Sequence, residues 1–202
     1  MPRLLLATHN EHKRREFARL FLASAGAGWQ LDALPGTVVL PPEDGDTFAE
    51  NALGKARAAA RASGRASIAD DSGIAAAALD GAPGVRSARY AGEDASDEQN
   101  LEKLLREAPP ASALEYVCSL AYVDPVAALE VVFEGRCAGR LAASRRGSGG
   151  FGYDPAFLPD DTPDGRTMAE LADGEKDAIS HRARAASALL GWLRAGRPLG
   201  VS

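Results

Sequence analysis

Long apolar runs are missing from this chain of 202 residues, and their absence limits where the protein is expected to work. No stretch approaches the roughly 20 apolar residues that a membrane-spanning helix needs. Residues 1–7 carry one arginine and a short apolar run without a cleavage site, so they are predicted to form a strand and not a signal peptide. We therefore expect no membrane partner and a cytoplasmic location.

Cysteine and histidine are also scarce, which argues against a disulfide framework and against a zinc site. The two cysteines, Cys118 and Cys137, form no CxxC pair and are predicted to be buried thiols in a reducing compartment. His9 and His12 have no further ligand residue nearby in the sequence, so the pair does not indicate zinc.

Basic charge is in deficit, since 28 acidic residues exceed 23 basic ones and the formal net charge is −5. Binding to a nucleic-acid duplex needs many phosphate contacts, so this balance argues against nucleic acid as a partner. A single nucleotide needs only a few cations that converge. Lysine is rare beside arginine, and Lys13, Lys55 and Lys176 each fall in a polar cluster, which makes them candidates for that task.

Apolar periodicity and capping signals predict strands that alternate with helices early in the chain and a hairpin in the middle. Strands are expected at 3–7, 29–40 (a region broken at Pro35 and Gly36), 66–69, 74–79, 114–123, 129–137 and 139–143. Helices are expected at 13–25 (ending at Gly26), 47–63, after Ser96, after Thr167 and from Ser180. This order is typical of an α/β fold with a mixed sheet. One domain, 1–202, is expected, with a possible second lobe at about 93–140 and a ligand cleft between lobes.

Two adjacent carboxylates, Asp70 and Asp71, follow a predicted strand and precede Ser72 and Gly73. Neighbours on a strand point to opposite faces, so one carboxylate can face a given cleft while the other fixes a glycine turn. Mg²⁺ prefers one or two carboxylates together with water and substrate phosphate. The alternative is a plain turn, because Asp, Ser and Gly are turn residues.

Residues 8–13 join the first strand to the first helix, where backbone N–H groups attract phosphate. Lys13 and the hydroxyl of Thr8 would supplement these groups; a solvated helix cap is the alternative. Asn51 and Lys55 are four residues apart and share one helix face. Glu43, in the acidic loop upstream, could supply a second carboxylate to a metal held by Asp71.

The glycine-rich segment 147–155 is the most unusual part of the chain. Glycines let a ligand approach the backbone closely, and an aromatic ring in such a loop, Phe151 or Tyr153, is a candidate stacking platform for a base. A tight turn with Phe151 packed in the core is the alternative. Pro155 follows Asp154 and stiffens the exit of the loop.

His181 and Arg182 are expected in the first turn of the last helix, after a Ser180 cap. Cations at this position oppose the helix dipole, which suggests that they have another use. Their donors could read an acceptor such as a purine 6-oxygen. An exposed basic turn is the alternative.

Together these segments resemble the inosine triphosphate pyrophosphatase family, in its bacterial dITP/XTP pyrophosphatase branch, over about residues 4–193. The motifs stand in the family's order: ATHNEHKRREF, TFAENALGKARAAA, ADDSGI, LDGAPGVRSARYAG, GFGYDPAF, TMAEL and EKDAISHRARA. The resemblance implies an elongated two-lobed α/β fold with a central mixed β-sheet flanked by helices and an active-site cleft between lobes. It also implies a homodimer that uses Mg²⁺ to hydrolyse deaminated purine nucleotides such as ITP, dITP and XTP to the monophosphate and pyrophosphate.

The resemblance also implies roles for residues of this chain. Asp71 would be the catalytic carboxylate and a magnesium ligand, with Glu43 as the second metal contact. The substrate contacts would be Thr8, His9, Asn10, Glu11, His12 and Lys13 at the triphosphate, Lys55 at the phosphates, Ser72, then Phe151, Gly152, Tyr153 and Asp154 at the base and sugar, and Lys176, His181 and Arg182 in the base pocket.

Two positions depart from the family's common pattern: His9 stands where many relatives have glycine, and Asp177 stands where asparagine is common. Neither removes a residue that the chemistry needs. Two other functions stay open at this point, a pyrophosphatase for modified pyrimidine nucleotides and a nucleotide-binding regulator without catalysis. The presence of Asp71, Glu43 and Lys13 argues against the regulator.

Overall fold

The computed structural model describes residues 2–24 and 28–196, in which strands and helices alternate. The strands are β1 (Arg3–Leu6), β2 (Gln30–Ala33), β3 (Ser67–Ala76), β4 (Ala113–Asp124), β5 (Leu129–Leu141) and β6 (Phe157–Pro159). The α-helices are α1 (Glu11–Ala23), α2 (Phe48–Ser63), α3 (Asp97–Glu107), α4 (Asp173–Ile179) and α5 (His181–Arg194). Short 3₁₀ turns lie at Ala77–Leu79, Gly84–Arg89, Asp154–Ala156 and Met168–Glu170.

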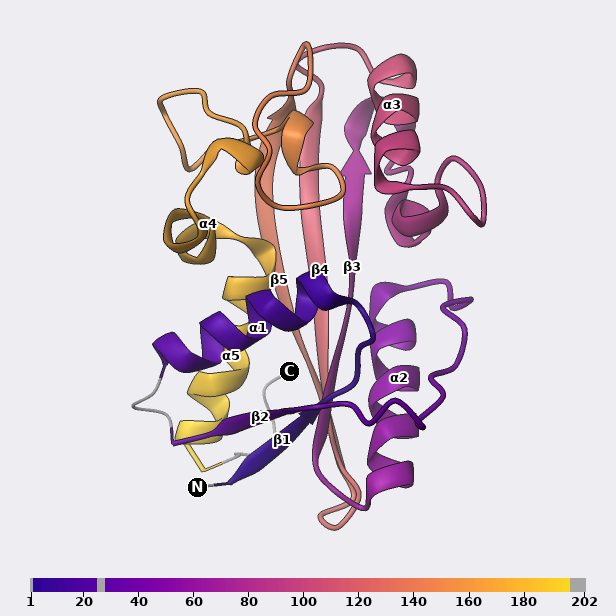
Figure 1. The fold of residues 1–202 in the computed structure, drawn as a ribbon, viewed down its shortest axis with the longest axis vertical. Helices are drawn as coiled ribbons and strands as arrows, with labels where there is room; N and C mark the ends of the chain where they lie inside the picture. The colour runs from indigo at the N-terminus through magenta and orange to yellow at the C-terminus, as the bar shows by residue number, and fades with distance from the viewer. Residues whose placement is uncertain (1, 25–27, 197–202) are drawn as a thin grey trace. The chain divides into compact units, whose positions relative to one another are not determined.

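The strands form one mixed six-stranded sheet in the order β2-β1-β3-β4-β5-β6. β1 pairs in parallel with β2 and β3, whereas β6 pairs antiparallel with β5. The predicted fold class, α/β with a mixed sheet flanked by helices, is confirmed (Figure 1). Over the described part of the chain, no helix has the length and apolar character needed to cross a membrane.

The described residues group into two compact units, and β3, β4 and β5 contribute residues to both. Of the described residues, the first unit draws on 2–24, 28–71, 118–135 and 182–196, and the second on 72–117 and 136–181. The second lobe expected at about 93–140 overlaps the second unit only in part, because residues 118–135 belong to the first. A single functional domain over 1–202 stays a prediction.

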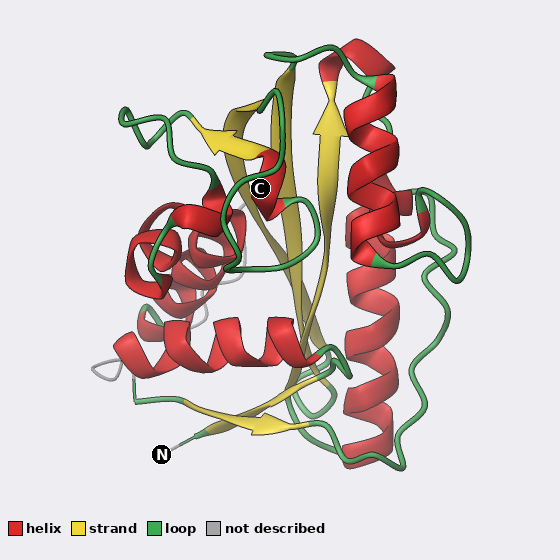
Figure 2. Cartoon of the chain, turned by 45° about the horizontal axis from the view of Figure 1, so that its top comes forward, coloured by secondary structure: helices red, strands yellow, loops and turns green. Residues whose placement is uncertain are grey.

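The first unit has a hydrophobic core on each face of its strands. α1 and α5 supply one core and the alanine-rich α2 supplies the other; Figure 2 shows these helices in red on either side of the yellow strands. Successive strand residues alternate between the two cores. Leu4, Leu6, Ile68, Leu120 and Tyr122 enter the first, and Leu5, Ala7, Ala69, Ala121 and Val123 enter the second.

The second unit has a core of its own. Leu101 and Leu104 of α3 pack in it with Ile74 of β3, Tyr116 of β4 and Phe157 of β6. α3 begins where predicted: Ser96 is its N-cap and forms a complete capping box with Gln99.

The predicted helix starts are close to the observed ones because the capping residues are local signals. α2 has the expected capping box of Thr47 and Glu50 and ends at Gly64, whose φ of 66° suits glycine. α1 begins at Glu11, two residues before the predicted start, with Asn10 as its N-cap. It ends at Ala23, and Gly26, the predicted stop, lies outside the described residues.

The strand predictions needed more correction. The region 29–40 contains only the four-residue β2, and the strand expected at 74–79 gives way to a 3₁₀ turn after Ala76. The expected glycine turn at Gly73 is wrong, because β3 runs unbroken from Ser67 to Ala76. A Cβ on Gly73 would lie 2.3 Å from Oγ of Ser87, so glycine here permits a close contact between segments.

Candidate functional site

The alternation of β3 sends two adjacent carboxylates to opposite faces of the strand. Ile68 packs in the core that α1 and α5 supply, and Ala69 packs in the core of α2. Asp70 and Asp71 continue this alternation. Asp70 accordingly contacts side chains of α1 and α5, whereas Asp71 contacts α2.

Asp70 is the centre of a buried ion-pair network. Its Oδ2 lies 3.1 Å from Nζ of Lys13 and 3.3 Å from Nε of Arg182, and Nη1 of Arg182 donates to Glu16 at 3.0 Å. Burial alone would raise the pKa of the Asp70 carboxyl, but Lys13, Arg182 and Lys55 outweigh burial and hold that pKa well below its usual range. Asp70 therefore stays ionised and fixes the positions of two cations.

Asp71 faces α2 in a different environment. Nδ2 of Asn51 donates to its Oδ2 at 2.9 Å, and Oδ1 of Asn51 accepts from the backbone N–H of Gly45 at 2.8 Å. Asn51 thus ties the acidic loop to Asp71. Burial raises the pKa of the Asp71 carboxyl, and the Glu43 carboxylate adds to that rise against the opposing effect of Lys55. A raised pKa makes this carboxylate a better proton acceptor.

The Lys55 ammonium lies where oxygens of three residues converge. It donates to Oε1 of Glu43 and, at 2.6 Å, to the backbone carbonyl of Asp70, and it lies 3.9 Å from Oδ1 of Asp71. Its side chain is 7% exposed. Burial alone would lower the pKa of Lys55, but the surrounding carboxylates outweigh burial and raise it. Lys55 therefore stays charged.

Glu43 and Asp71 have donor chemistry that suits a hard divalent cation. Both offer carboxylate oxygens, and the same ammonium group contacts both. Within 2–24 and 28–196, no group of three or more His, Cys, Asp or Glu side chains could hold a metal ion. Mg²⁺ is commonly bound by one or two carboxylates with water and substrate phosphate as the remaining ligands. The donor set therefore fits a Mg²⁺ ion that shares its coordination with a nucleotide.

Residues 8–13 form the N-terminal cap of α1. Oγ1 of Thr8 accepts from the N–H of Asn10 at 3.1 Å, and Oδ1 of Asn10 accepts from the N–H of Lys13 at 3.0 Å. Nε2 of His9 lies 3.1 Å from the carbonyl oxygen of Val38. The cap holds the Lys13 backbone, and the Lys13 side chain reaches Asp70 from there.

The second unit contains a smaller cluster around Asp154. Its carboxylate accepts from Nζ of Lys176 at 2.6 Å, from the hydroxyl of Tyr116 at 3.0 Å and from the N–H of Phe151 at 3.0 Å. The Asp154 and Lys176 side chains are each 4% exposed. Nζ of Lys176 lies 5.2 Å from the centre of the Phe151 ring, and the ring of His181 stacks on Tyr116 at 4.6 Å. One buried ion pair is therefore bordered by rings.

The glycine-rich loop is shaped by this carboxylate. Gly150 has a φ of +67°, and a Cβ there would lie 2.0 Å from Oδ2 of Asp154. The N–H of Gly152 donates to Oδ2 of Asp97 at 2.9 Å. Between them Phe151 is half-buried and is not among the buried residues of a hydrophobic core, so the alternative of a core-packed Phe151 is wrong.

Tyr153 and Arg182 lie in surroundings that the sequence did not predict. Tyr153 is 6% exposed and belongs to the core, and its hydroxyl donates to the carbonyl oxygen of Ser87 at 2.7 Å. Arg182, expected in the base pocket, contacts Asp70 and Glu16 of the first unit. Phe151 is therefore the better-placed aromatic residue of the loop for contact with a ligand.

The predicted site residues fall into two sets. The first unit brings together Lys13, Glu43, Lys55, Asp71 and Arg182 by direct contacts or a shared partner, and the second brings together Phe151, Asp154, Lys176 and His181. Ser72 is half-buried in β3, whereas Glu11 and His12 are exposed on α1.

Some residues of these clusters were missed by sequence reasoning. Glu16 follows Lys13 by three residues on α1, so helical spacing could have placed it on the same face. Tyr116 gave no signal, because it looks like any aromatic residue of a strand. Asp70 was treated as a turn residue, although the strand alternation pointed to a second polar face.

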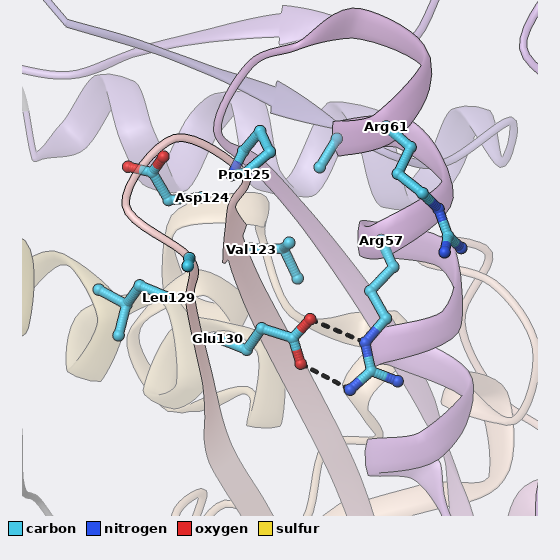
Figure 3. A pocket seen from close by; sticks show the side chains of 9 residues that line it. Arg57, Arg61, Val123, Asp124, Pro125, Leu129 and Glu130 are labelled. Carbon is cyan, nitrogen blue, oxygen red and sulfur yellow. Dashed lines mark hydrogen bonds and ion pairs between the residues drawn. The ribbon is translucent and has the colours of Figure 1, made fainter.

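A surface hollow of about 390 Å³ lies in the first unit, beside α2 and the connection from β4 to β5. Figure 3 shows Arg57 and Glu130 at its edge, joined by two hydrogen bonds, with Arg61, Val123 and Leu129 around it. None of the predicted site residues lines this hollow. It is therefore distinct from both clusters.

Comparison with known proteins identifies relatives over nearly the whole chain. The Ham1 family model matches residues 4–192. A dITP/XTP pyrophosphatase of Geobacillus kaustophilus is 48% identical, with 94% of this chain and 93% of the relative covered. A dITP/XTP pyrophosphatase of Mycolicibacterium paratuberculosis is 47% identical, with 92% of each chain covered.

Solved structures agree with this result. A HAM1 protein of Coxiella burnetii is similar with a TM-score of 0.85 and 35% identity, covering 96% of this chain and 100% of the other. A nucleoside-triphosphatase, or dITP/XTP pyrophosphatase, of Mycobacterium abscessus is similar with a TM-score of 0.70 and 41% identity, covering 95% and 99%.

Proposed function

Because the chain belongs to the Ham1 family, we propose that it hydrolyses deaminated purine nucleoside triphosphates, ITP, dITP and XTP, to the monophosphate and pyrophosphate. This reaction removes damaged nucleotides from the precursor pool. The observation that carries the proposal is that β3 directs its two carboxylates to different partners. Asp71 contacts Asn51 and Lys55 of α2, and Lys55 also contacts Glu43, while Asp70 contacts Lys13. Such an array of carboxylates and cations suits triphosphate chemistry.

We propose Mg²⁺ as the cofactor, with Glu43 and Asp71 as its protein ligands. When bound, Mg²⁺ would neutralise charge on the phosphate oxygens. Asp71 orients a water molecule and accepts its proton, and that water attacks the α-phosphorus. The bond from this phosphorus to the bridging oxygen breaks, and pyrophosphate leaves. The Asn51 amide, which donates to Oδ2 of Asp71 at 2.9 Å, supports this role because it holds the carboxylate in place.

Cations of the first unit are proposed to bind the triphosphate. Lys13 stands in the first turn of α1, beside the N–H groups that Thr8 and Asn10 arrange. Lys13 and Lys55 stabilise the charge that develops on the leaving pyrophosphate. His9, Glu11 and His12 are proposed to border the same phosphates, and Ser72 to contact the substrate.

The second unit is proposed to hold the base and sugar through Phe151, Gly152, Tyr153 and Asp154. Lys176 and His181 would direct donors at the purine 6-position, where hypoxanthine and xanthine carry an oxygen and adenine carries an amino donor. A mismatched buried donor costs about 1–3 kcal/mol. The half-buried Phe151 ring beside Lys176 supports this assignment.

Arg182 is the residue for which sequence and structure give different expectations. If Arg182 reads the base, Arg182→Ala should narrow the difference in kcat/KM between ITP and ATP. If Arg182 serves only as the ion-pair partner of Asp70 and Glu16, Arg182→Ala should leave the ratio of kcat/KM for ITP to that for ATP unaltered. The same variant should then lose about 3–5 kcal/mol of its free energy of unfolding. Steady-state kinetics and urea unfolding of this variant separate the two roles.

The direct test of the function is pyrophosphate release from ITP, dITP, XTP, GTP and ATP, with and without Mg²⁺. We expect release from the first three and dependence on Mg²⁺. Turnover confined to modified pyrimidine nucleotides would replace the substrate class. Binding of ITP without any release of pyrophosphate would mark the chain as a regulator.

A homodimer in the cytoplasm completes the proposal. The buried thiols of Cys118 and Cys137 are compatible with a reducing compartment. Light scattering coupled to gel filtration should give twice the 21.0 kDa chain mass, whereas a mass of one chain would contradict the dimer.

A further inference from the structure

We infer that the Lys55 ammonium and a divalent cation compete for the same oxygens, so that the metal enters the site together with the nucleotide and not before it. The inference rests on the proposed function, since it concerns the metal ligands of that reaction. It gives Lys55 a second task, which is to balance the charge of the carboxylates until substrate arrives.

The first argument is the convergence of ligands on one point. Lys55 contacts a carboxylate oxygen of Glu43, the backbone carbonyl of Asp70 and, more distantly, a carboxylate oxygen of Asp71. Carboxylate and carbonyl oxygens are also the ligands that hard divalent cations prefer. A cation that takes these oxygens must therefore displace the ammonium group or lie next to it.

The second argument is electrostatic. Lys55 is 7% exposed, and two cations a few ångströms apart in such a site repel each other much more strongly than in water. The ammonium group must therefore move when the metal arrives, and it then needs a new anion. A nucleotide phosphate supplies one, and the flexible four-carbon stem lets Lys55 reach it. The same phosphates complete the coordination of the metal.

Lys13 provides a matched control. It is the same residue type in the same unit, and its ammonium contacts Oδ2 of Asp70 on the opposite face of β3. Removal of either lysine makes the cluster more negative by one charge. Only the removal of Lys55 clears the oxygens that the metal is proposed to use.

The experiment is a titration of nucleotide-free protein with Mg²⁺ alone, followed by calorimetry and by the midpoint of thermal unfolding. We expect Lys55→Met to bind Mg²⁺ at least roughly tenfold more tightly than the wild type, and Lys13→Met to gain clearly less. Glu43→Gln in the Lys55→Met background should abolish the gain. No gain in Lys55→Met, or an equal gain in Lys13→Met, would overturn the inference.

If Lys55→Met does not fold, metal binding by the wild type still tests the inference. Equilibrium dialysis with Mn²⁺ should show little bound metal with protein alone and roughly tenfold more, at equal free Mn²⁺, with an α,β-methylene analogue of dITP. Equal binding in both cases would reject the inference. Pyrophosphate release from dITP by the wild type tests the function separately. If the protein releases pyrophosphate but shows neither metal-binding result, only the binding order is rejected. If no nucleotide is turned over, the function is rejected.

Discussion

The two clusters of this protein carry charge in different ways. Around Asp70 and Asp71, carboxylates and three cations crowd into one part of the first unit. Burial acts to raise the pKa of both carboxyls, but the cations outweigh it at Asp70, so the pKa of Asp70 is lowered while that of Asp71 is raised. Around Asp154 there is a single ion pair with Lys176, bordered by rings. The first suits a polyanion and a metal, and the second suits a flat, uncharged base. Rate and base selectivity should therefore respond to different mutations.

The largest effect is expected from Asp71→Asn, which removes the proposed proton acceptor and one metal ligand. The value of kcat for ITP should fall by about 10²- to 10⁴-fold, while the preference for ITP over ATP is retained. The control is Asp80→Asn, the same chemical change at an exposed residue with a φ of 52° that asparagine tolerates. Near-normal turnover by Asp71→Asn in the presence of Mg²⁺ would remove Asp71 from catalysis.

The next effect is expected from Lys176→Met, which leaves the buried Asp154 carboxylate without its cation. The free energy of unfolding should fall by about 3–5 kcal/mol, and the preference for ITP over ATP should decrease. Lys103→Met is the control, because it makes the same change at another lysine of the second unit, whose ammonium group contacts the carbonyl oxygen and the ring of Tyr90. The double variant with Asp154→Asn should recover part of the stability. A lower rate with unchanged base preference would contradict the division of tasks.

How far the sequence predicts these clusters depends on how local each signal is. The capping boxes at Thr47 and Ser96 and the alternation that separates Asp70 from Asp71 are read within a few residues, and the structure has them. The Arg182–Glu16 pair joins residues 166 positions apart, so neither spacing nor composition predicts it.

The glycine-rich loop also shows how far sequence composition can predict the structure. Its conformational freedom could be read from composition, but the reason for Gly150 is the Asp154 carboxylate that would collide with a side chain. Likewise Phe151 and Tyr153 look equivalent in sequence. Only packing separates them, because the Tyr153 hydroxyl reaches the Ser87 carbonyl inside the core and the Phe151 ring stays half-buried.

A smaller effect is expected from Phe151→Leu, which keeps an apolar side chain and removes the stacking surface. Loss of stacking on a base costs about 1–3 kcal/mol, so KM for ITP should rise roughly 5- to 150-fold with little change in kcat. Phe48→Leu is the comparison, since Phe48 is an aromatic residue of the first unit at the start of α2. A fall in kcat with unchanged KM would place Phe151 outside base binding.

The smallest effect, a shift in pH dependence, is expected at Asn51, whose amide donates to Asp71 and so lowers the pKa of that carboxyl. The reaction needs Asp71 ionised, so kcat/KM falls as pH drops through this pKa, and a higher pKa moves the fall to higher pH. Asn51→Ala removes the donor and should shift the acid limb upward. Asn51→Asp keeps an acceptor for the Gly45 N–H but brings a second negative charge to Asp71, so its shift should be larger. Profiles of kcat/KM against pH for the three proteins check this order; an acid limb that stays in place in both variants would mean that a group other than Asp71 sets it.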